Sequence, residues 1–156
     1  MAELWRRPDG VEISTDPARL DVAAIHAQLG SREHTRDMPR EIVERLVAGS
    51  LCFGVYDGPR QIGFGRVVTD WATFAYIGDV YVLEAHRGAG LGTWLMETIL
   101  GHPGLAGLRR WMLMCGPRAV TLYRRFGFVE GSATGHLMHR TERDLYRRRT
   151  GGAETP

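Results

Sequence analysis

The chain has 156 residues, of which 44% are hydrophobic and 24% are charged, and its formal net charge is +2. This length suits a single domain, and the composition is that of a folded globular protein rather than a disordered chain. No apolar run approaches the ~20 residues that a membrane-spanning helix needs. The basic residues are all arginines, and most are spread along the sequence, which gives no reason to expect a nucleic-acid partner.

Hydrophobic periodicity divides the chain into short strands and helices. Strands are indicated where polar and apolar residues alternate, and helices where apolar residues recur every three or four positions. Gly, Pro and Asp residues mark most of the boundaries. In chain order the predicted elements are a strand at 11–14, helices at 16–30 and 40–48, strands at 51–56, 61–69 and 73–83, a helix at 90–100, a strand at 109–115, a helix at 118–126, and two short strands at 128–129 and 135–139.

This order of elements predicts an α/β domain with a mixed sheet. We expect residues 1–140 to form one domain and residues 141–156 to form a basic, flexible tail. The N-terminus does not resemble a secretory signal, so we expect a cytoplasmic protein. Cys52 and Cys115 match no metal or redox spacing, so we expect two reduced cysteines and no metal site.

A Gly-rich turn follows the predicted strand at 73–83 and leads directly into a predicted helix. Gly88, Gly90 and Gly92 allow a positive φ and a close approach of ligand to backbone. The first N–H groups of a helix have no partner within it, and the helix dipole favours an anion there. Arg87 adds charged donors, so the turn predicts a diphosphate site. The dinucleotide fingerprint is not met, because Thr93 stands where its third Gly would be, and the nucleoside-triphosphate loop needs a lysine that the chain lacks.

The run from Arg87 to Gly92 resembles the R/Q-x-x-G-x-G/A signature of the GNAT superfamily of N-acetyltransferases, and Asp79-Val80-Tyr81-Val82 resembles the family's fourth strand. The resemblance implies a GNAT-like acyl-CoA N-acyltransferase fold, with about seven strands and about four helices, and acetyl-CoA as co-substrate. In that family the turn binds the pyrophosphate of coenzyme A and the strand pairs with its pantetheine arm. Carried over by position, these groups are Arg87, Gly88, Ala89, Gly90, Leu91, Gly92 and Thr93 for pyrophosphate, and Val80, Tyr81 and Val82 for pantetheine.

The segment from Ala119 to Phe128 resembles the family's A-x-x-L-Y-x-x-x-G-F segment. There the Tyr protonates the departing coenzyme A thiolate, so the resemblance implies that Tyr123 is the general acid. Many relatives carry Asn or Asp just before this helix, where this chain has Cys115-Gly116-Pro117-Arg118. A backbone group of Cys115 or Gly116 could hold pantetheine instead, and Arg118 could meet a phosphate. The sequence does not decide between these alternatives.

An ammonium acceptor must lose a proton before it attacks a thioester, and a carboxylate can accept that proton directly or through water. Asp79, which shares a strand face with Tyr81, is the first candidate for this base, and Glu84 is the second. We expect the acceptor site between the first two helices and the strand hairpins. Candidate residues there are Glu33, His34, Asp37, Trp71, Phe74 and Tyr76.

The sequence therefore predicts an N-acetyltransferase that moves an acetyl group from acetyl-CoA to a primary amine of a small molecule in a direct ternary complex. The alternative is a non-catalytic acyl-CoA-binding regulatory domain, which would need the Gly-rich turn but not Tyr123. The presence of Tyr123 favours the enzyme. Neither a nucleic acid nor a membrane is expected as a partner, and the sequence does not exclude a homodimer.

Overall fold

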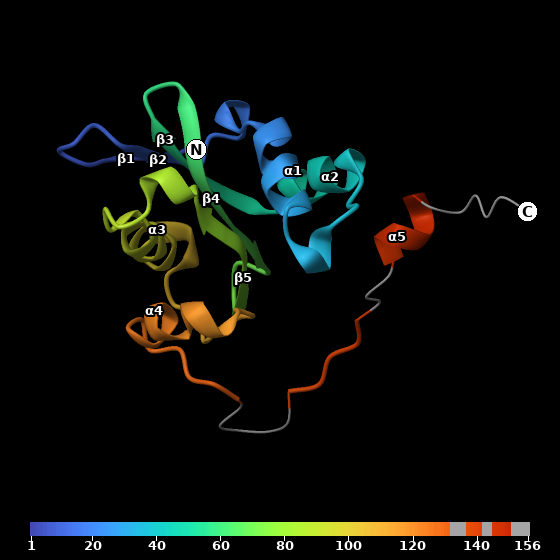
Figure 1. Ribbon diagram of the computed structural model, residues 1–156. Helices are drawn as coiled ribbons and strands as arrows, with labels where there is room; N and C mark the ends of the chain where they lie inside the picture. Colours follow the sequence, from blue (N-terminus) through green and yellow to red (C-terminus); the bar gives the residue numbers. More distant parts are fainter. Residues whose placement is uncertain (132–136, 142–144, 151–156) are drawn as a thin grey trace, which may run out of the picture.

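The structure, a computed structural model, describes residues 1–131, 137–141 and 145–150, and within the last segment it describes the side chains of 145, 146 and 148. It is an α/β domain in which helices cover both faces of one mixed sheet, as predicted (Figure 1). The described residues contain six strands rather than about seven. They are β1 (Leu4–Arg6), β2 (Glu12–Ser14), β3 (Leu51–Asp57), β4 (Arg60–Thr69), β5 (Phe74–Val82) and β6 (Arg110–Leu113).

The six strands lie side by side in sequence order. Neighbouring strands are antiparallel except β5 and β6, which are parallel. A parallel pair needs a crossover connection, and α3 (Leu91–Leu100) supplies it. The mixed sheet therefore has a single parallel junction, between β5 and β6, and the Gly-rich turn lies in the connection across that junction.

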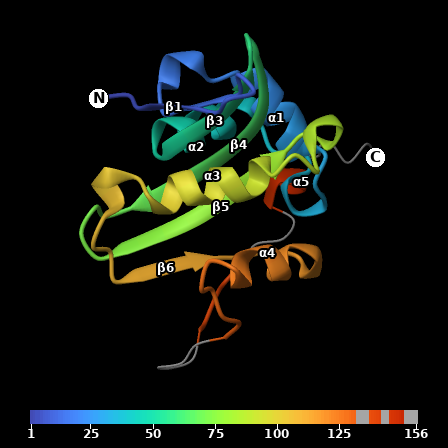
Figure 2. The same ribbon diagram turned by 90° about the vertical axis from the view of Figure 1, so that its left-hand side faces the viewer.

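Two helices cover one face of the sheet and a third covers the other (Figures 1 and 2). The first pair is α1 (Val22–Gly30) and α2 (Arg40–Ala48), and the opposite face carries α3. The short helix α4 (Val120–Arg124) follows β6, and α5 (Leu145–Thr150) lies on the side of α1 and α2. The bounds of α2 agree with the predicted helix at 40–48.

Each face of the sheet has its own apolar core. On β3, Phe53 faces the core beneath α3, whereas Cys52 faces the core beneath α1 and α2, because successive side chains of a strand point to opposite faces. Leu95 of α3 is fully buried in the first core and Ile25 of α1 in the second. Each such side chain contributes roughly 1.5–3 kcal/mol by leaving water, so both helix layers are held to the sheet by apolar burial.

The N-terminal region differs from the prediction in two ways. Strand β1 was not predicted, and it forms an antiparallel hairpin with β2. The helix predicted at 16–30 is divided into a 3-10 turn, Pro17–Arg19, and α1. The division falls at Asp21, whose carboxylate accepts a hydrogen bond of 2.9 Å from the Ala24 N–H and so caps a new helix.

The C-terminal region also differs. The helix predicted at 118–126 is a 3-10 turn, Pro117–Ala119, followed by the shorter α4. The strand predicted at 128–129 is wrong, because these two residues form no strand pairing. Of the strand predicted at 135–139, residues 135 and 136 lie outside the described residues, and 137–139 are not a strand. Helix α5 lies within the predicted tail, and its Tyr146 packs against the core of α1 and α2.

Candidate active site

The Gly-rich turn connects β5 to α3 through a 3-10 turn, Glu84–His86. Gly88 and Gly90 have φ values of +84° and +75°, which side chains with a Cβ rarely adopt. A Cβ built at Gly88, Gly90 or Gly92 would meet no heavy atom within 4 Å. Backbone conformation therefore requires glycine at positions 88 and 90, and all three glycines leave open space above the turn.

The N-terminus of α3 has unpaired donors that face this space. Gly90 is the N-cap and provides no side-chain cap. The first amide of the helix with a backbone partner is that of Trp94, which donates to the Gly90 carbonyl oxygen at 3.0 Å. Among the described residues the amides of Leu91, Gly92 and Thr93 thus have no backbone partner and remain for a ligand, and the helix dipole favours an anion there. The turn fits a diphosphate.

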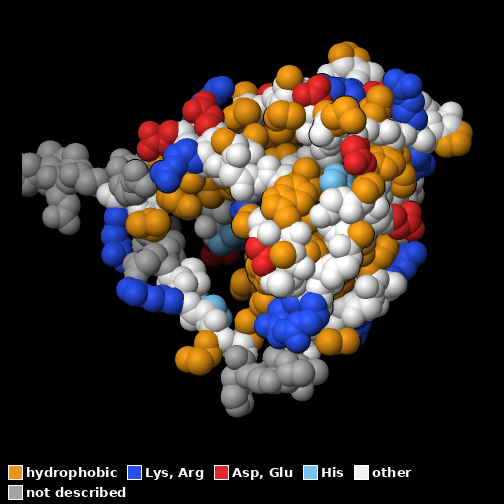
Figure 3. All heavy atoms as spheres, turned by 180° about the vertical axis from the view of Figure 1, so that it is seen from behind, with side chains coloured by type: hydrophobic (Ala, Val, Ile, Leu, Met, Phe, Trp, Pro, Cys, Tyr) orange, Lys and Arg blue, Asp and Glu red, His pale blue; other side chains and the backbone are white. Residues whose placement is uncertain are grey.

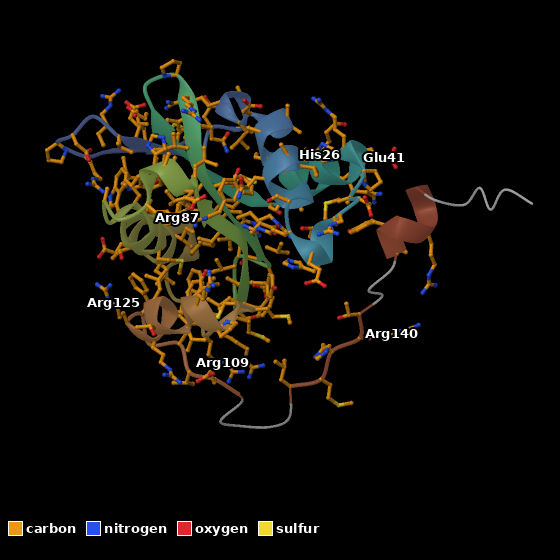
Figure 4. The ribbon with its side chains drawn as sticks, viewed as in Figure 1. His26, Glu41, Arg87, Arg109, Arg125 and Arg140 are labelled. Atoms are coloured by element: carbon orange, nitrogen blue, oxygen red, sulfur yellow. The ribbon has the colours of Figure 1, made fainter. Side chains whose placement is uncertain are left out.

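Two arginines adjoin the turn. Nε of Arg87 donates a hydrogen bond of 3.0 Å to the carbonyl oxygen of Val82, which fixes the side chain along the last residues of β5. In Figure 4 it lies between the strands and the start of α3. Nη1 of Arg7 donates to the carbonyl oxygen of Ala89 at 3.0 Å, and its guanidinium lies 5.6 Å from the centre of the Trp94 ring. The turn is thus flanked by the positive charge of Arg87, which directly follows β5 and the 3-10 turn, and of Arg7, which comes from the N-terminal hairpin.

Strands β5 and β6 separate just before the turn. Their pairing runs from Phe74 and Arg110 to Ile77 and Leu113 and then ends. Among the described residues, the later part of β5 pairs with β4 alone. Two neighbouring strands that diverge in this way leave backbone groups of the inner strand available to a ligand.

Val80 and Val82 have their backbone groups on the side of this gap, where the Val82 carbonyl oxygen accepts the hydrogen bond from Arg87 and the Val80 carbonyl oxygen lies 3.4 Å from Nη2 of Arg32. The Leu83 N–H donates to Ile62 on the β4 side at 2.8 Å, and backbone groups alternate along a strand, so those of Val80 and Val82 point the other way. Tyr81 pairs with Phe64 across β4, and its buried ring packs 6.1 Å from the Phe64 ring. Burial raises the pKa of Tyr81 to about 12.

A β-bulge shapes the same part of β5. Between the pairs Phe64–Tyr81 and Arg66–Gly78, the single residue Gly65 faces two residues of β5. One of them, Asp79, has a φ of +56°, which is unusual for a residue with a side chain. The bulge turns the strand at the point where β5 leaves β6.

Asp79 is held by two guanidinium groups. Nε of Arg66 lies 2.6 Å from its Oδ2, and Nη1 of Arg32 lies 3.5 Å from its Oδ1. The Asp79 side chain is 13% exposed. The second candidate for the base, Glu84, is exposed and lies beyond the end of β5, in the 3-10 turn. The two candidate bases therefore occupy different environments.

Tyr123 is buried on α4, with its ring 6.1 Å from that of Phe128. Within the described residues its hydroxyl makes no hydrogen bond. The hydroxyl is not fully buried, so solvent or a ligand can reach it. Burial raises the pKa of Tyr123; the neighbouring Cys115 raises it further, whereas Arg32 opposes the shift. The phenol therefore stays protonated at neutral pH and can donate.

A pocket of about 280 Å³ lies between β6 and α4. Tyr123, Cys115 and Phe128 line it, together with Trp111 and Leu113 of β6. Cys115 is exposed at the end of β6. Arg118 is exposed in the 3-10 turn before α4. The pocket thus brings Cys115 and Tyr123, which the sequence places eight residues apart, to one cavity.

The acceptor candidates divide into two groups. Exposed residues of the connection between α1 and α2 lie next to Arg32, whereas others lie along β5. The former are Glu33, His34 and Asp37, and the latter are Phe74 and Tyr76, with Trp71 just before them. Tyr76 is close enough to Tyr123 to affect its pKa. Trp71 and Phe74 lie at the far end of β5 from the bulge, so the structure does not bring all six together.

Three arginines of the site were not identified from the sequence. Arg7, Arg32 and Arg66 reach it through contacts with residues 82, 47 and 13 positions away. No local motif marks such contacts. The sequence contains one relevant signal: the two-residue period of a strand puts Arg66 on the same face of β4 as Phe64. This period does not indicate which carboxylate Arg66 contacts.

Comparison with known proteins assigns the family. Residues 19–128 match the family model described as the acetyltransferase (GNAT) family. A Gibberella zeae protein named "Putative acetyltransferase" is 37% identical, over 70% of this chain and 73% of that protein. A Xanthomonas campestris protein, described as a "putative acetyltransferase belonging to the gnat family", is 43% identical, with a TM-score of 0.82 over 87% of this chain and 96% of that one. The chain belongs to the GNAT family of acetyltransferases.

A more distant structure shares the fold. It is a Clostridium acetobutylicum protein described as a "predicted acetyltransferase with acetyl-CoA", 11% identical, with a TM-score of 0.59 over 88% of this chain and 96% of that one. At this identity the likeness concerns the fold alone.

In the described part of the present chain, no helix has the length and apolar character required to cross a bilayer.

Proposed function

We propose that the protein is an N-acetyltransferase that moves the acetyl group of acetyl-CoA to a primary amine of a small molecule. The observation that carries this proposal is the uncapped N-terminus of α3, which follows two positive-φ glycines directly after the splayed end of β5. A diphosphate at the turn and an extended arm along the strand edge would use both features at once. Membership of the GNAT family supports the same reading.

We assign the coenzyme to these backbone groups. The turn and the start of α3, Arg87 to Thr93, would hold the pyrophosphate through their amides. Val80 and Val82 would pair with the amides and carbonyls of pantetheine in the gap beside β5, and Tyr81, which lies between them on β5, would hold this part of the strand to β4 through its pairing with Phe64. Cys115 and Arg118, at the exposed end of β6, would contact the coenzyme from the other side of the gap.

The transfer is a direct attack in a ternary complex. The amine nitrogen attacks the thioester carbon, a C–N bond forms, and the C–S bond breaks. The departing thiolate takes a proton from the Tyr123 hydroxyl, which has no other hydrogen-bond partner among the described residues. A backbone N–H at the β5 bulge stabilises the developing negative charge on oxygen. The ammonium loses one proton before the attack. The nitrogen loses a second proton as the amide forms, and that proton, carried by water, restores the Tyr123 phenol.

Asp79 is the first candidate for accepting that proton, directly or through a water molecule. It lies at the bulge, where the thioester would reach the end of the strand gap. Both of its oxygens already accept hydrogen bonds from guanidinium groups, which competes with proton transfer. Among the described residues Glu84 has no such guanidinium partner, but it lies toward the phosphate end of the site. The position of Asp79 at the bulge favours it as the base, whereas the carboxylate oxygens of Glu84, which accept no hydrogen bond from an arginine among the described residues, favour Glu84.

The alternative function is a non-catalytic acyl-CoA-binding domain that regulates a partner. Such a domain would require the turn, but it would gain nothing from a phenol in the pocket beside β6. Tyr123 therefore favours the enzyme. We expect the enzyme to act in the cytoplasm, and a homodimer is compatible with the proposal.

Release of free coenzyme A thiol, measured with acetyl-CoA and a panel of primary amines, tests the proposal. We expect turnover with at least one amine, and a loss of about 10²-fold or more in kcat for Tyr123→Phe, since general acid catalysis contributes about 10²–10⁴-fold. Tyr56→Phe is the matched control, because Tyr56 is also buried but lies on β3 beneath Arg19. Tight acetyl-CoA binding without turnover of any amine would support the regulatory domain instead.

A further inference from the structure

Arg32 occupies the acceptor side of the proposed site. It belongs to the connection between α1 and α2, and its guanidinium lies 5.7 Å from the centre of the Tyr81 ring. Its Nη2 is 3.4 Å from the carbonyl oxygen of Val80, and its Nη1 is 3.5 Å from Oδ1 of Asp79. Its positive charge also acts on the pKa of Tyr123. Arg32 thus stands at the bulge, between the candidate base and the candidate acid.

The hydrogen-bonding capacity of Arg32 is largely unused. A guanidinium has five N–H donors, and both contacts of Arg32 are at the long limit for a hydrogen bond. The other guanidinium on the same carboxylate, that of Arg66, is at 2.6 Å. Arg66 therefore neutralises Asp79, and Arg32 is a surplus positive charge. In the part of the chain that the structure describes, Asp79 is the carboxylate that pairs with Arg32.

Partial burial makes this surplus charge consequential. The Arg32 side chain is 24% exposed and lies on the buried Tyr81. A positive charge in such a setting is stabilised by an anion of matching shape, and a planar carboxylate matches the guanidinium fork. Viewed from behind, the surface of the molecule is hollowed, and basic and acidic side chains lie around the hollow (Figure 3). The neighbouring Asp79 offers the complementary negative group.

We propose that the acceptor is a small zwitterionic amine, such as an α-amino acid, whose carboxylate binds Arg32 while its ammonium group lies at Asp79. This inference rests on the proposed function and names the substrate class for it. The zwitterion would replace one long ion pair with two shorter ones, so the net charge of the site would not change. A diamine would instead bring its second ammonium group to Arg32, and like-charge repulsion would disfavour it.

Matched pairs of amines that differ by the carboxylate alone test the inference. Suitable pairs are phenylalanine with 2-phenylethylamine and lysine with 1,5-diaminopentane. We expect kcat/KM for the accepted amino acid to exceed that of its decarboxylated partner about tenfold or more. One charge-assisted hydrogen bond between the carboxylate and Arg32 stabilises the bound amino acid enough to account for this ratio. In Arg32→Gln this preference should fall to near one, with the KM for acetyl-CoA changed less than about twofold.

Two variants complete the experiment. Arg36→Gln, an exposed arginine of the same connection, is the control and should keep the wild-type preference. Arg32→Lys keeps the charge without the fork, so its preference should lie between those of the wild type and Arg32→Gln. It also replaces Arg32→Gln as the decisive variant if the latter does not fold.

The outcomes separate the inference from the function on which it rests. Equal or better turnover of the decarboxylated amines, or an unchanged preference in Arg32→Gln, would overturn the zwitterion and leave the N-acetyltransferase intact. A protein that does not bind acetyl-CoA, or binds it and acetylates neither member of any pair, would refute the small-molecule N-acetyltransferase and the inference together.

Discussion

Nη1 of Arg7 lies 3.0 Å from the carbonyl oxygen of Ala89, 82 residues later in the chain. The same guanidinium pairs with Asp9 at 2.9 Å and stacks on Trp94, the first residue of α3 with a backbone-bonded amide. The N-terminal hairpin therefore holds the Gly-rich turn in place from outside. We expect this contact to pre-organise the amides that would bind the pyrophosphate.

Replacing Arg7 with Ala should weaken acetyl-CoA binding without changing the chemical step. One hydrogen bond of this kind is worth ~1 kcal/mol, so we expect KM for acetyl-CoA to rise about three- to tenfold and kcat to stay within about twofold. Steady-state kinetics with varied acetyl-CoA measure both constants. Arg6→Ala is the control, since Arg6 pairs with Glu12 and does not touch the turn. A fall in kcat with unchanged KM would contradict this role for Arg7.

The two cysteines should differ sharply in reactivity. Cys115 is exposed in the pocket with Tyr123, whereas Cys52 is buried and its pKa is raised to about 12 by burial. At pH 8 iodoacetamide should therefore label Cys115 and leave Cys52 unmodified, because the thiolate is the nucleophile. Saturating acetyl-CoA should slow the labelling of Cys115 if the coenzyme lies beside it.

Mass spectrometry of the alkylated protein distinguishes the two sites. Cys115→Ser should remove the labelling of the folded protein, and unfolding in guanidinium should expose Cys52 in both forms. If Cys115 is labelled at the same rate with and without acetyl-CoA, Cys115 does not belong to the coenzyme site.

Alkaline pH should destabilise the protein through Tyr81. Its pKa is about 12 in the folded protein, because it is buried, and about 10 in an unfolded chain. The unfolded state thus ionises first, so the stabilisation from the neutral phenol is complete below pH 10 and is lost as the pH rises to 12. We expect this group to lower the free energy of unfolding by about 2 kcal/mol across that window.

Urea unfolding at pH 8 and pH 11 measures the effect. Tyr81→Phe should lose less stability between the two pH values than the wild type does. Parallel losses in the two proteins would show that Tyr81 does not titrate differently in the folded state.

Local sequence signals predicted the parts of the fold that local chemistry determines. Helix α2 follows from the spacing of Ile42, Val43, Leu46 and Val47 and ends at Gly49, and the structure places it at the predicted residues. The Gly-rich turn follows from glycine itself, since Gly88 and Gly90 adopt positive φ values. In both cases the residue type and its spacing are sufficient to fix the backbone.

Features that depend on distant partners were not predicted. Strand β1 is three residues long, and it forms because β2 pairs with it. The bulge at Asp79 arises from the register of β4 against β5 and from the guanidinium of Arg66, neither of which is visible in the run Gly78–Val80. Arg32 reaches the site across 47 residues. Sequence spacing therefore indicated the proposed coenzyme site, while the charged groups on the acceptor side required the fold.

The affinity of the turn for acetyl-CoA, measured by isothermal titration calorimetry, tests the central claim most directly. Gly90→Glu puts a carboxylate among the free amides of α3, whereas Gly107→Glu makes the same change at a glycine of similar φ, +81°, before β6. We expect Gly90→Glu to raise Kd about 100-fold or more and Gly107→Glu to leave it within about twofold. A Kd that is unchanged in a folded Gly90→Glu variant would contradict the assignment of this turn as the coenzyme site.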